Sequence, residues 1–393
     1  MRHSTDRILC THAGRLSASL REFEPLDLAV GRGEAPEDER YADMKQKAVE
    51  DVVRHQVELG LDVISDGELG RRRDFAYYSK RMGGIELRDL REGEVGATVF
   101  RSRERDAFKE YYAEVDSKRA AVARPKRIVC TGPLESRSLD TLHAEIAGFK
   151  AALTQAAMAE HGDVEAFFPV IAPGWLDHFI FNEHYSNDDD FIEALAEVMR
   201  PEYEAVVAAG LNVQIDDPGI CDSWPTIYPK PTIDEYRRYA KVRVDALNHA
   251  LRNIPADRIR YHCCWGSWVG PHSEDLPLKH IVDLMLSLNI QAYSVEAGNV
   301  QHEHEWRVWQ DVKLPAGKML IPGVVSHKTE VVEHPELVAE RLTRYAECVG
   351  RENVQAGTDC GMGLGRVHHE IGWAKIASMV EGARLASERL WAK

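Results

Sequence analysis

Residues 261–266 read Tyr-His-Cys-Cys-Trp-Gly, a short apolar segment that places an imidazole and a thiol two positions apart. Because side chains of a β-strand alternate between its two faces, His262 and Cys264 point the same way and Cys263 points the other way. Imidazole and thiolate are preferred zinc ligands, and a tetrahedral site needs four ligands. The pair alone is not specific, since buried cysteines often serve as small apolar side chains. The remaining ligands must come from elsewhere in the chain.

Eight strand-like segments occur along the chain, and nearly all are followed by a helical pattern: residues 8–11, 61–65, 166–171, 212–215, 258–264, 291–295, 318–325 and 353–357. Mostly apolar strands that alternate with helices predict a parallel sheet covered by helices. Such units, over 393 residues, predict an α/β fold, the (β/α)8 TIM barrel. Residues from about 69 to 164 interrupt the pattern. We therefore expect a single catalytic domain over residues 1–393, with an insertion after the second strand.

Polar or reactive side chains follow almost every predicted barrel strand. In a barrel of this kind the C-terminal ends of the strands meet at one face, which is where active sites lie. Residues that are distant in sequence are thereby predicted to become neighbours. The residues at these strand ends are Glu68, Asp216, His262, Cys264, Glu296, His327 and Cys360.

Two of these strand-end residues are candidates for the missing zinc ligands. We assign His262 and Cys264 to the sixth strand, Glu296 to the end of the seventh, and Cys360 to a glycine-flanked turn after the eighth. Taken singly, Cys360 could be a tight-turn cysteine and Glu296 a solvated loop carboxylate. Thiolate, imidazole and carboxylate on neighbouring strands of one barrel instead predict a four-ligand Zn²⁺ site.

Composition limits the classes of partner. The net charge of −15 argues against nucleic acid, whose phosphates need a basic protein surface, and no apolar run is long enough to span a membrane. The polar N-terminal residues do not resemble a secretory signal. Seven cysteines, an odd number scattered through the chain, do not indicate a disulfide framework. We expect a cytoplasmic protein, either monomer or homo-oligomer.

Five short segments near the predicted strand ends form a recognisable series in chain order: Gly60-Leu61-Asp62-Val63 with Gly67-Glu68, Gln214-Ile215-Asp216-Asp217-Pro218, His262-Cys263-Cys264, Ser294-Val295-Glu296, and Thr358-Asp359-Cys360-Gly361. Together they resemble the catalytic domain of cobalamin-independent methionine synthase and its zinc-dependent relatives, which include epoxyalkane–coenzyme M transferase. The similarity extends from about residue 8 to residue 365 and covers most of the chain.

The resemblance implies a zinc ion that activates the thiol of a small substrate for attack on a methyl group or an epoxide. Coordination to the metal lowers the pKa of a thiol, so that the thiolate is held at neutral pH. A carboxylate ligand such as Glu296 could loosen as the sulfur binds. Methyl transfer to homocysteine, giving methionine, is the leading expectation. The alternative is an epoxyalkane–coenzyme M transferase-type addition of a thiol to an epoxide.

The resemblance also suggests roles for three other strand-end residues. Glu68 and Asp216 match the carboxylates that hold the amino group of homocysteine, and charge pairing with the arginine run 71–73 is the alternative. His327 lies one residue away from the position of a histidine proposed as proton donor. A histidine titrates near pH 7 and can protonate a leaving group, whereas helix capping or support of the site is the alternative role.

The chain departs from the family pattern at three places. Arg15 replaces a serine near the amino acid's carboxylate, and could anchor an acidic group of the substrate or be a surface arginine paired with an acid. The turn 361–366 is Gly-Met-Gly-Leu-Gly-Arg, richer in glycine than usual. We also expect no counterpart of the N-terminal half of full-length methionine synthase. The donor therefore need not be a methylfolate, and a methylated corrinoid protein is an alternative.

Several aromatic and histidine residues remain to be placed. Trp175, Trp224, Trp265 and Trp268 could face the substrate, although most tryptophans serve in packing. Residues 302–306, His-Glu-His-Glu-Trp, lack the H-E-x-x-H spacing of a metal motif and are expected to open a helix on the rim.

Two other classes of protein are compatible with a zinc-bearing barrel. The first is a non-catalytic zinc-storage protein, against which the set of carboxylates and histidines at the strand ends argues. The second is a hydrolase with a metal-bound hydroxide. Two thiolate ligands make zinc electron-rich, which favours thiol alkylation over water activation.

Overall fold

The computed structural model describes residues 1–31, 34–71, 78, 81–119, 126–158, 164–363 and 367–392. Within them, eight parallel strands form one sheet. Its two edge strands are joined where the Asp62 amide donates to the Cys10 carbonyl at 2.9 Å and the Thr11 hydroxyl donates to the Val63 carbonyl at 2.8 Å. The predicted TIM barrel is therefore confirmed. The strand order is β1 (Leu9–Cys10), β11 (Gln355–Thr358), β10 (Met319–Val325), β9 (Ala292–Glu296), β8 (Ile259–Cys263), β7 (Asn212–Asp216), β5 (Glu165–Ile171) and β2 (Val63–Ile64).

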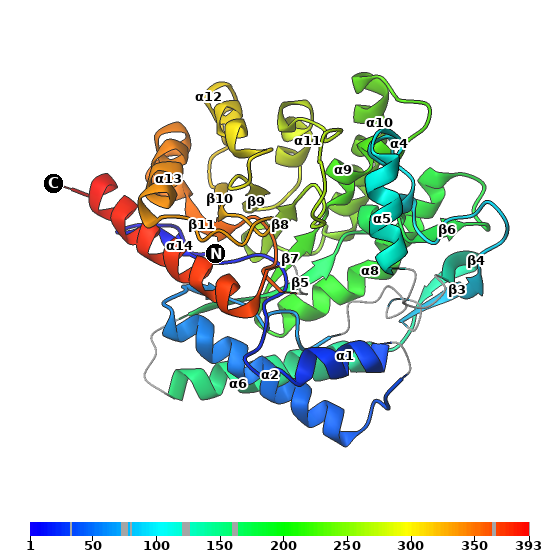
Figure 1. Ribbon diagram of the computed structural model, residues 1–393, viewed down its shortest axis with the longest axis horizontal. Coiled ribbons are helices and arrows are strands. Elements are labelled where there is room, and N and C mark those ends of the chain that lie inside the picture. Colours follow the sequence, from blue (N-terminus) through cyan, green and yellow to red (C-terminus); the bar gives the residue numbers. More distant parts are fainter. Residues whose placement is uncertain are drawn as a thin grey trace.

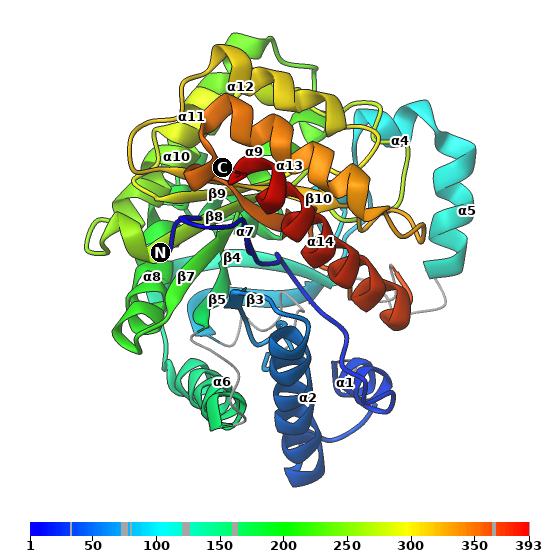
Figure 2. The same cartoon turned by 90° about the vertical axis from the view of Figure 1, so that its left-hand side faces the viewer.

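Long amphipathic helices cover the outside of this barrel (Figures 1 and 2). The start of helix α10 (Ile233–Ala250) is stabilised by a capping box, in which the Thr232 hydroxyl accepts from the Glu235 amide and the Glu235 carboxylate accepts from the Thr232 amide. Each described helix is too short or too polar to cross a membrane. The main covering helices are α2 (Glu39–Glu58), α6 (Asp140–Met158), α8 (Asp188–Ala208), α10 (Ile233–Ala250), α13 (Pro335–Val349) and α14 (His369–Leu390).

The predicted insertion after the second strand is confirmed and forms a second, smaller sheet. In it β3 (Met82–Asp89) pairs antiparallel with β4 (Lys126–Ser136), and β4 pairs parallel with β6 (Ile180–Asn182). Neither β3 nor β6 was predicted, and β6 lies outside the predicted insertion because it comes from a segment that follows β5. The helix α6 lies within the 69–164 stretch but packs beside α2 on the barrel, where Gln46 donates to the Gly148 carbonyl at 3.2 Å.

Two helices of the insertion, α4 (Arg103–Ala107) and α5 (Lys109–Arg119), lie over the loops that follow β7 and β8. Arg103 donates to the Ile227 carbonyl at 2.8 Å, and the Tyr111 hydroxyl donates to the Val269 carbonyl at 2.9 Å. Glu104 accepts from the Ser273 amide at 2.8 Å. The insertion thus builds a wall at the C-terminal face of the barrel.

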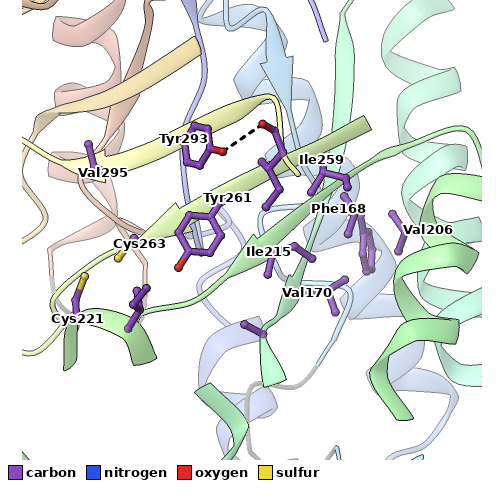
Figure 3. Packing of buried hydrophobic residues seen from close by; sticks show 14 of the residues in the cluster. Phe168, Val170, Val206, Ile215, Cys221, Ile259, Tyr261, Cys263, Tyr293 and Val295 are labelled. Carbon is purple, nitrogen blue, oxygen red and sulfur yellow. Dashed lines mark hydrogen bonds between the residues drawn. The ribbon is translucent and has the colours of Figure 1, made fainter. Parts of the chain in front are cut away.

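The side of β8 that faces away from the predicted metal ligands is packed with apolar side chains (Figure 3). Tyr261 and Cys263 are fully buried there, with Cys221 of α9 (Gly219–Asp222) next to Cys263. The Tyr261 hydroxyl donates to Asp217 at 2.9 Å. This packing fixes the rotation of β8 about its axis and hence the direction in which His262 points.

Candidate metal and substrate site

Three of the predicted zinc ligands converge at the C-terminal face. The ligand atoms of His262, Cys264 and Cys360 all lie within 4.8 Å of one another. His262 is in β8, Cys264 is the first residue after that strand, and Cys360 lies two residues after β11. The three side chains are buried, so few waters compete for the site. Two sulfurs and one imidazole nitrogen form a donor set that suits zinc.

The imidazole of His262 is oriented for coordination. Its Nδ1 lies 3.2 Å from the Ser294 hydroxyl, which fixes the ring. Its buried Nε2 has no hydrogen-bond partner among the described residues. A metal-binding histidine normally uses one ring nitrogen for the metal and the other for a supporting hydrogen bond. The unpartnered Nε2 therefore fits a metal at this place.

The two cysteines are electrostatically coupled. A hydrogen bond from Cys264, with the neighbouring His262, holds the pKa of the Cys360 thiol well below its usual range although burial opposes this. The same pairing, together with burial, raises the pKa of Cys264. Burial opposes protonation of His262, but the Cys360 sulfur outweighs it and raises the pKa of that imidazole. Negative charge is thus favoured at Cys360, as a cation site requires.

Glu296, the fourth predicted ligand, is beside this group but not part of it. One carboxylate oxygen accepts from the Trp265 amide at 3.1 Å. The other accepts from Asn299 at 2.7 Å and from the Lys328 ammonium at 2.9 Å. Burial opposes ionisation of Glu296, but Lys328 and then His327 lower its pKa. The carboxylate is therefore ionised and held by three donors.

The strand numbering that was predicted for the ligands needs correction. β8 and β9 are the fifth and sixth strands of the barrel in chain order, and β11 is the eighth. β10 lies between β9 and β11, so Glu296 and Cys360 are not on adjacent strands. The separation is bridged by Asp359, which accepts from the Ala297 and Gly298 amides at 2.7 and 2.8 Å. Sequence analysis did not identify this function of Asp359, although the residue precedes Cys360.

Arg15 connects the Cys360 turn to Glu68. Its carbonyl accepts from the Gly363 amide at 2.8 Å, and its guanidinium donates to the Glu68 carbonyl at 3.1 Å and pairs with Asp27 at 3.2 Å. The side chain is only 1% exposed, so Arg15 is paired with an acid but is not a surface residue. Residues 364–366 of the glycine-rich turn lie outside the described residues.

The predicted amine-binding carboxylates also lie at this face. Glu68 is buried and has a φ of 56°, a left-handed conformation that is uncommon for a residue with a side chain. Asp216 is the β-sheet partner of His262. Burial and then the charge of Glu68 raise the pKa of Asp216 to about 7, while His262 and Arg71 oppose the shift. The charges of the two carboxylates thus interact close to His262, and the positive charge of Arg71 partly offsets the rise in the pKa of Asp216. Arg72 and Arg73 lie outside the described residues.

His327 is fully buried after β10, and its charge lowers the pKa of both Glu296 and Cys360. It therefore belongs to the same site. Trp175 is half-buried in α7 (Pro173–Leu176), edge-on to Phe179 with ring centres 5.0 Å apart. Among the described residues, its ring contacts are with His178 and Phe179, which follow it closely in the chain.

A cavity of about 230 Å³ lies between the insertion and the loops after β7 and β8. Phe100, Tyr111 and Tyr112 line it from the insertion, and Asp222 and Trp268 line it from the barrel. Asp222 is 4% exposed, one of its carboxylate oxygens has no partner among the described residues, and burial raises its pKa well above the usual value. Sequence reasoning missed Asp222, whose only signal was its place after a strand end.

The predicted helical turn on the rim is confirmed as a 3-10 helix, Glu303–Arg307, followed by α12 (Val308–Asp311). His302, just before it, stacks on Trp265 with ring centres 3.8 Å apart. Its two nitrogens lie 3.0 Å from Asp275 and 3.0 Å from Glu305. Burial disfavours the charged ring, but these two carboxylates outweigh it and raise the pKa of His302 to about 9.

Because its pKa is raised, His302 makes the free energy of unfolding depend on pH. A histidine with a raised pKa stabilises the fold fully below its unfolded value of about 6.5, and the contribution is lost as pH rises through 9. We expect the free energy of unfolding to fall by on the order of 3 kcal/mol between pH 6.5 and 9.5 from this group. Urea unfolding of wild type and His302→Gln measures it. The variant should lack this part of the pH dependence, whereas the exposed neighbour variant His304→Gln should keep it.

The family model for the catalytic domain of cobalamin-independent synthases matches residues 21–104 and 180–385. A methionine synthase of Thermococcus kodakarensis is 23% identical over 359 residues, which are 91% of this chain and 87% of that protein. A methionine synthase of Saccharolobus solfataricus is 25% identical over 224 residues, which are 56% of this chain and 58% of that protein.

Two solved structures share the fold. A B12-independent methionine synthase from Shewanella sp. W3-18-1, in complex with selenomethionine, has a TM-score of 0.71 at 17% identity and covers 98% of this chain and 100% of that chain. A putative vitamin-B12-independent methionine synthase from Listeria monocytogenes has a TM-score of 0.65 at 16% identity and covers 96% of this chain and 98% of that chain. At such identities the structures support the barrel fold.

Proposed function

The chain belongs to the catalytic-domain family of the cobalamin-independent synthases, and we propose that it is a zinc-dependent methyltransferase that methylates the thiol of homocysteine to give methionine. The observation that carries the proposal is the convergence of His262, Cys264 and Cys360 within 4.8 Å. These residues would hold the zinc ion. When bound, zinc supplies a Lewis acid that keeps a substrate thiol ionised at neutral pH.

The other residues of the face would bind and orient the substrate. Glu68 and Asp216 accept the ammonium group of homocysteine, because two interacting buried carboxylates are stabilised by a cation placed between them. The Asp216 pKa of about 7 favours this, since the bound cation lowers it and keeps the carboxylate ionised. His327, which is fully buried after β10, would give a proton to the leaving group of the donor. The cavity beside Asp222 provides space for part of the donor, either a methylfolate or the methylated corrinoid of a partner protein.

The charges at the face favour homocysteine over a sulfonate thiol such as coenzyme M. Two carboxylates repel a sulfonate, and the Arg15 guanidinium is already bound to Asp27 and to the Glu68 carbonyl. Addition of such a thiol to an epoxide therefore remains the second proposal. The cysteines, all of them free, are compatible with a reducing cytoplasm as the place of action.

A thiol screen tests the proposed acceptor. Purified enzyme should hold about one zinc per chain, since one site is proposed. X-ray absorption at the zinc edge should then show one additional sulfur when homocysteine is added, and none when coenzyme M, glutathione or cysteine is added at the same concentration. Methylation assays with methylfolate and methylcobalamin would identify the donor. An additional sulfur with coenzyme M but not with homocysteine would favour the epoxide reaction instead.

A further inference from the structure

The loop that follows β10, residues 326–334, carries His327 and is tied together at its two ends. Ser326 and His327 are buried at its start and Glu333 is buried near its end, whereas residues 329–332 between them are exposed. One oxygen of the Glu333 carboxylate accepts from the Ser326 amide at 2.8 Å. The backbone next to His327 is therefore fixed by the Glu333 carboxylate.

Glu333 is fixed in turn by one face of α14. The Lys375 ammonium lies 2.8 Å from the second oxygen of its carboxylate and also donates to the Val331 carbonyl. Ser378, three residues further along and on the same face of the helix, donates to the Glu333 carbonyl. The side chains of Lys375 and Glu333 are 0% and 7% exposed. A lysine is almost never fully buried unless it is paired, so α14 holds the loop through a specific ion pair.

The helix α14 is a firm support for this loop. It lies beside α13, which begins at Pro335 directly after the loop (Figures 1 and 2). A Cβ atom at Gly382 of α14 would lie 2.4 Å from the Val338 side chain of α13, so the two helices approach closely there. α14 also contacts β1 and β10 of the barrel. Close packing of this kind resists displacement, so the ion pair fixes the loop relative to the barrel.

The position of a proton donor matters for one class of methyl donor and not for another. When a thiolate attacks the methyl group of a methylfolate, the carbon–nitrogen bond breaks and its electron pair stays on a basic nitrogen, which must take up a proton. When the thiolate attacks methylcobalamin, the electron pair of the cobalt–carbon bond stays on cobalt, which is reduced to cobalt(I) and takes up no proton. Displacement of His327 should therefore slow only the first reaction.

We propose that Lys375 and Glu333 are positioning residues that hold His327 in place for proton transfer to a nitrogen leaving group. This inference rests on the proposed function, which gives His327 the task of proton donor. The two residues act through the Ser326 amide and the loop, not by contact with the reacting atoms.

Rates with the two donors test this role in wild type, His327→Gln, Lys375→Met and the double variant Lys375→Met with Glu333→Gln. The double variant removes both charges, so no unpaired charge stays buried to unfold the protein. With a methylfolate, kcat should fall about 100-fold or more in His327→Gln and about 10-fold in both Lys375 variants, because general acid catalysis contributes about 10²–10⁴-fold. With methylcobalamin, kcat should stay within about twofold. The KM for homocysteine and the zinc content should not change.

Hydrogen exchange followed by mass spectrometry adds a measurement that needs no activity. Peptides that cover residues 326–334 should exchange about tenfold faster in Lys375→Met than in the wild type, while peptides from β8 keep their rates. The control is Arg389→Met, which breaks an exposed ion pair between α14 and Glu336 of α13. It should change neither the exchange of the loop nor the rate with either donor.

Three results overturn the inference. The first is unchanged exchange of the loop in Lys375→Met. The second is an equal loss of rate with both donors, because Lys375 then acts on the whole site and not on His327. The third is a slow methylfolate reaction in His327→Gln but not in the Lys375 variants. Failure of the wild type to methylate homocysteine with either donor, with loop exchange as expected, would contradict the proposed reaction but not the support of the loop.

Discussion

Replacement of Cys360 by serine should remove bound zinc and with it the methylation of homocysteine. Cys360 is one of three side chains whose ligand atoms lie within 4.8 Å of one another, and its pKa is held low by Cys264 and His262. A serine hydroxyl does not ionise at neutral pH and is a poor zinc ligand. Loss of groups that only support ligands costs 10–100-fold in metal affinity, so loss of a ligand should cost at least about 100-fold. Metal analysis after gel filtration and a chelator titration measure this.

Cys263→Ser is the matched control for Cys360→Ser. Cys263 lies between His262 and Cys264 in the chain but packs on the other side of β8, next to Cys221 (Figure 3). Its replacement should lower stability by about 1–3 kcal/mol, because a hydroxyl is buried among apolar groups, and should leave zinc affinity unchanged. Zinc content in Cys360→Ser equal to that of the wild type would reject the metal site.

The fold could be predicted from the sequence because its signals are local. A run of apolar residues followed by a helical pattern needs no knowledge of distant contacts, and its repetition indicates the barrel. Convergence of the strand-end residues then follows from the geometry of any such barrel. For the same reason the side of β8 on which His262 and Cys264 lie could be derived from strand alternation alone.

The parts that could not be predicted depend on contacts between distant segments. Nothing near Glu296 in the sequence indicates that Lys328, from the next strand end, binds its carboxylate. Arg15 is buried, donates to the Glu68 carbonyl and pairs with Asp27 of α1 (Phe23–Gly31), which lies twelve residues further along the chain. The short β6 joins the sheet of the insertion although the barrel strand β5 separates it from that segment in the chain. In each of these three cases several partners are available, and the packing of segments that are distant in the sequence determines which one is bound.

Replacement of Glu68 by glutamine should raise the KM for homocysteine by about 10–100-fold, because a charged hydrogen bond to a buried partner contributes about 1.5–3 kcal/mol. Glutamine keeps the size of the side chain, so the left-handed backbone at this position need not change. Binding of zinc should also be unaffected, since Glu68 lies outside the group of His262, Cys264 and Cys360. Steady-state kinetics with homocysteine as the varied substrate measure the effect.

The comparison that isolates the amine uses 4-mercaptobutyrate, which is homocysteine without its amino group. If Glu68 binds the ammonium group, Glu68→Gln should change the KM for 4-mercaptobutyrate by less than about threefold, since less than 1 kcal/mol is then at stake. Equal losses for the two thiols would exclude amine binding and indicate that Glu68 acts on the shape of the site. The same variant should lower the pKa of Asp216, because burial still raises that pKa but the like charge of Glu68 no longer adds to it. Asp216 then ionises over a lower pH range, so the acidic limb of kcat/KM for homocysteine should move to lower pH in Glu68→Gln, a shift that a purely structural role of Glu68 would not produce.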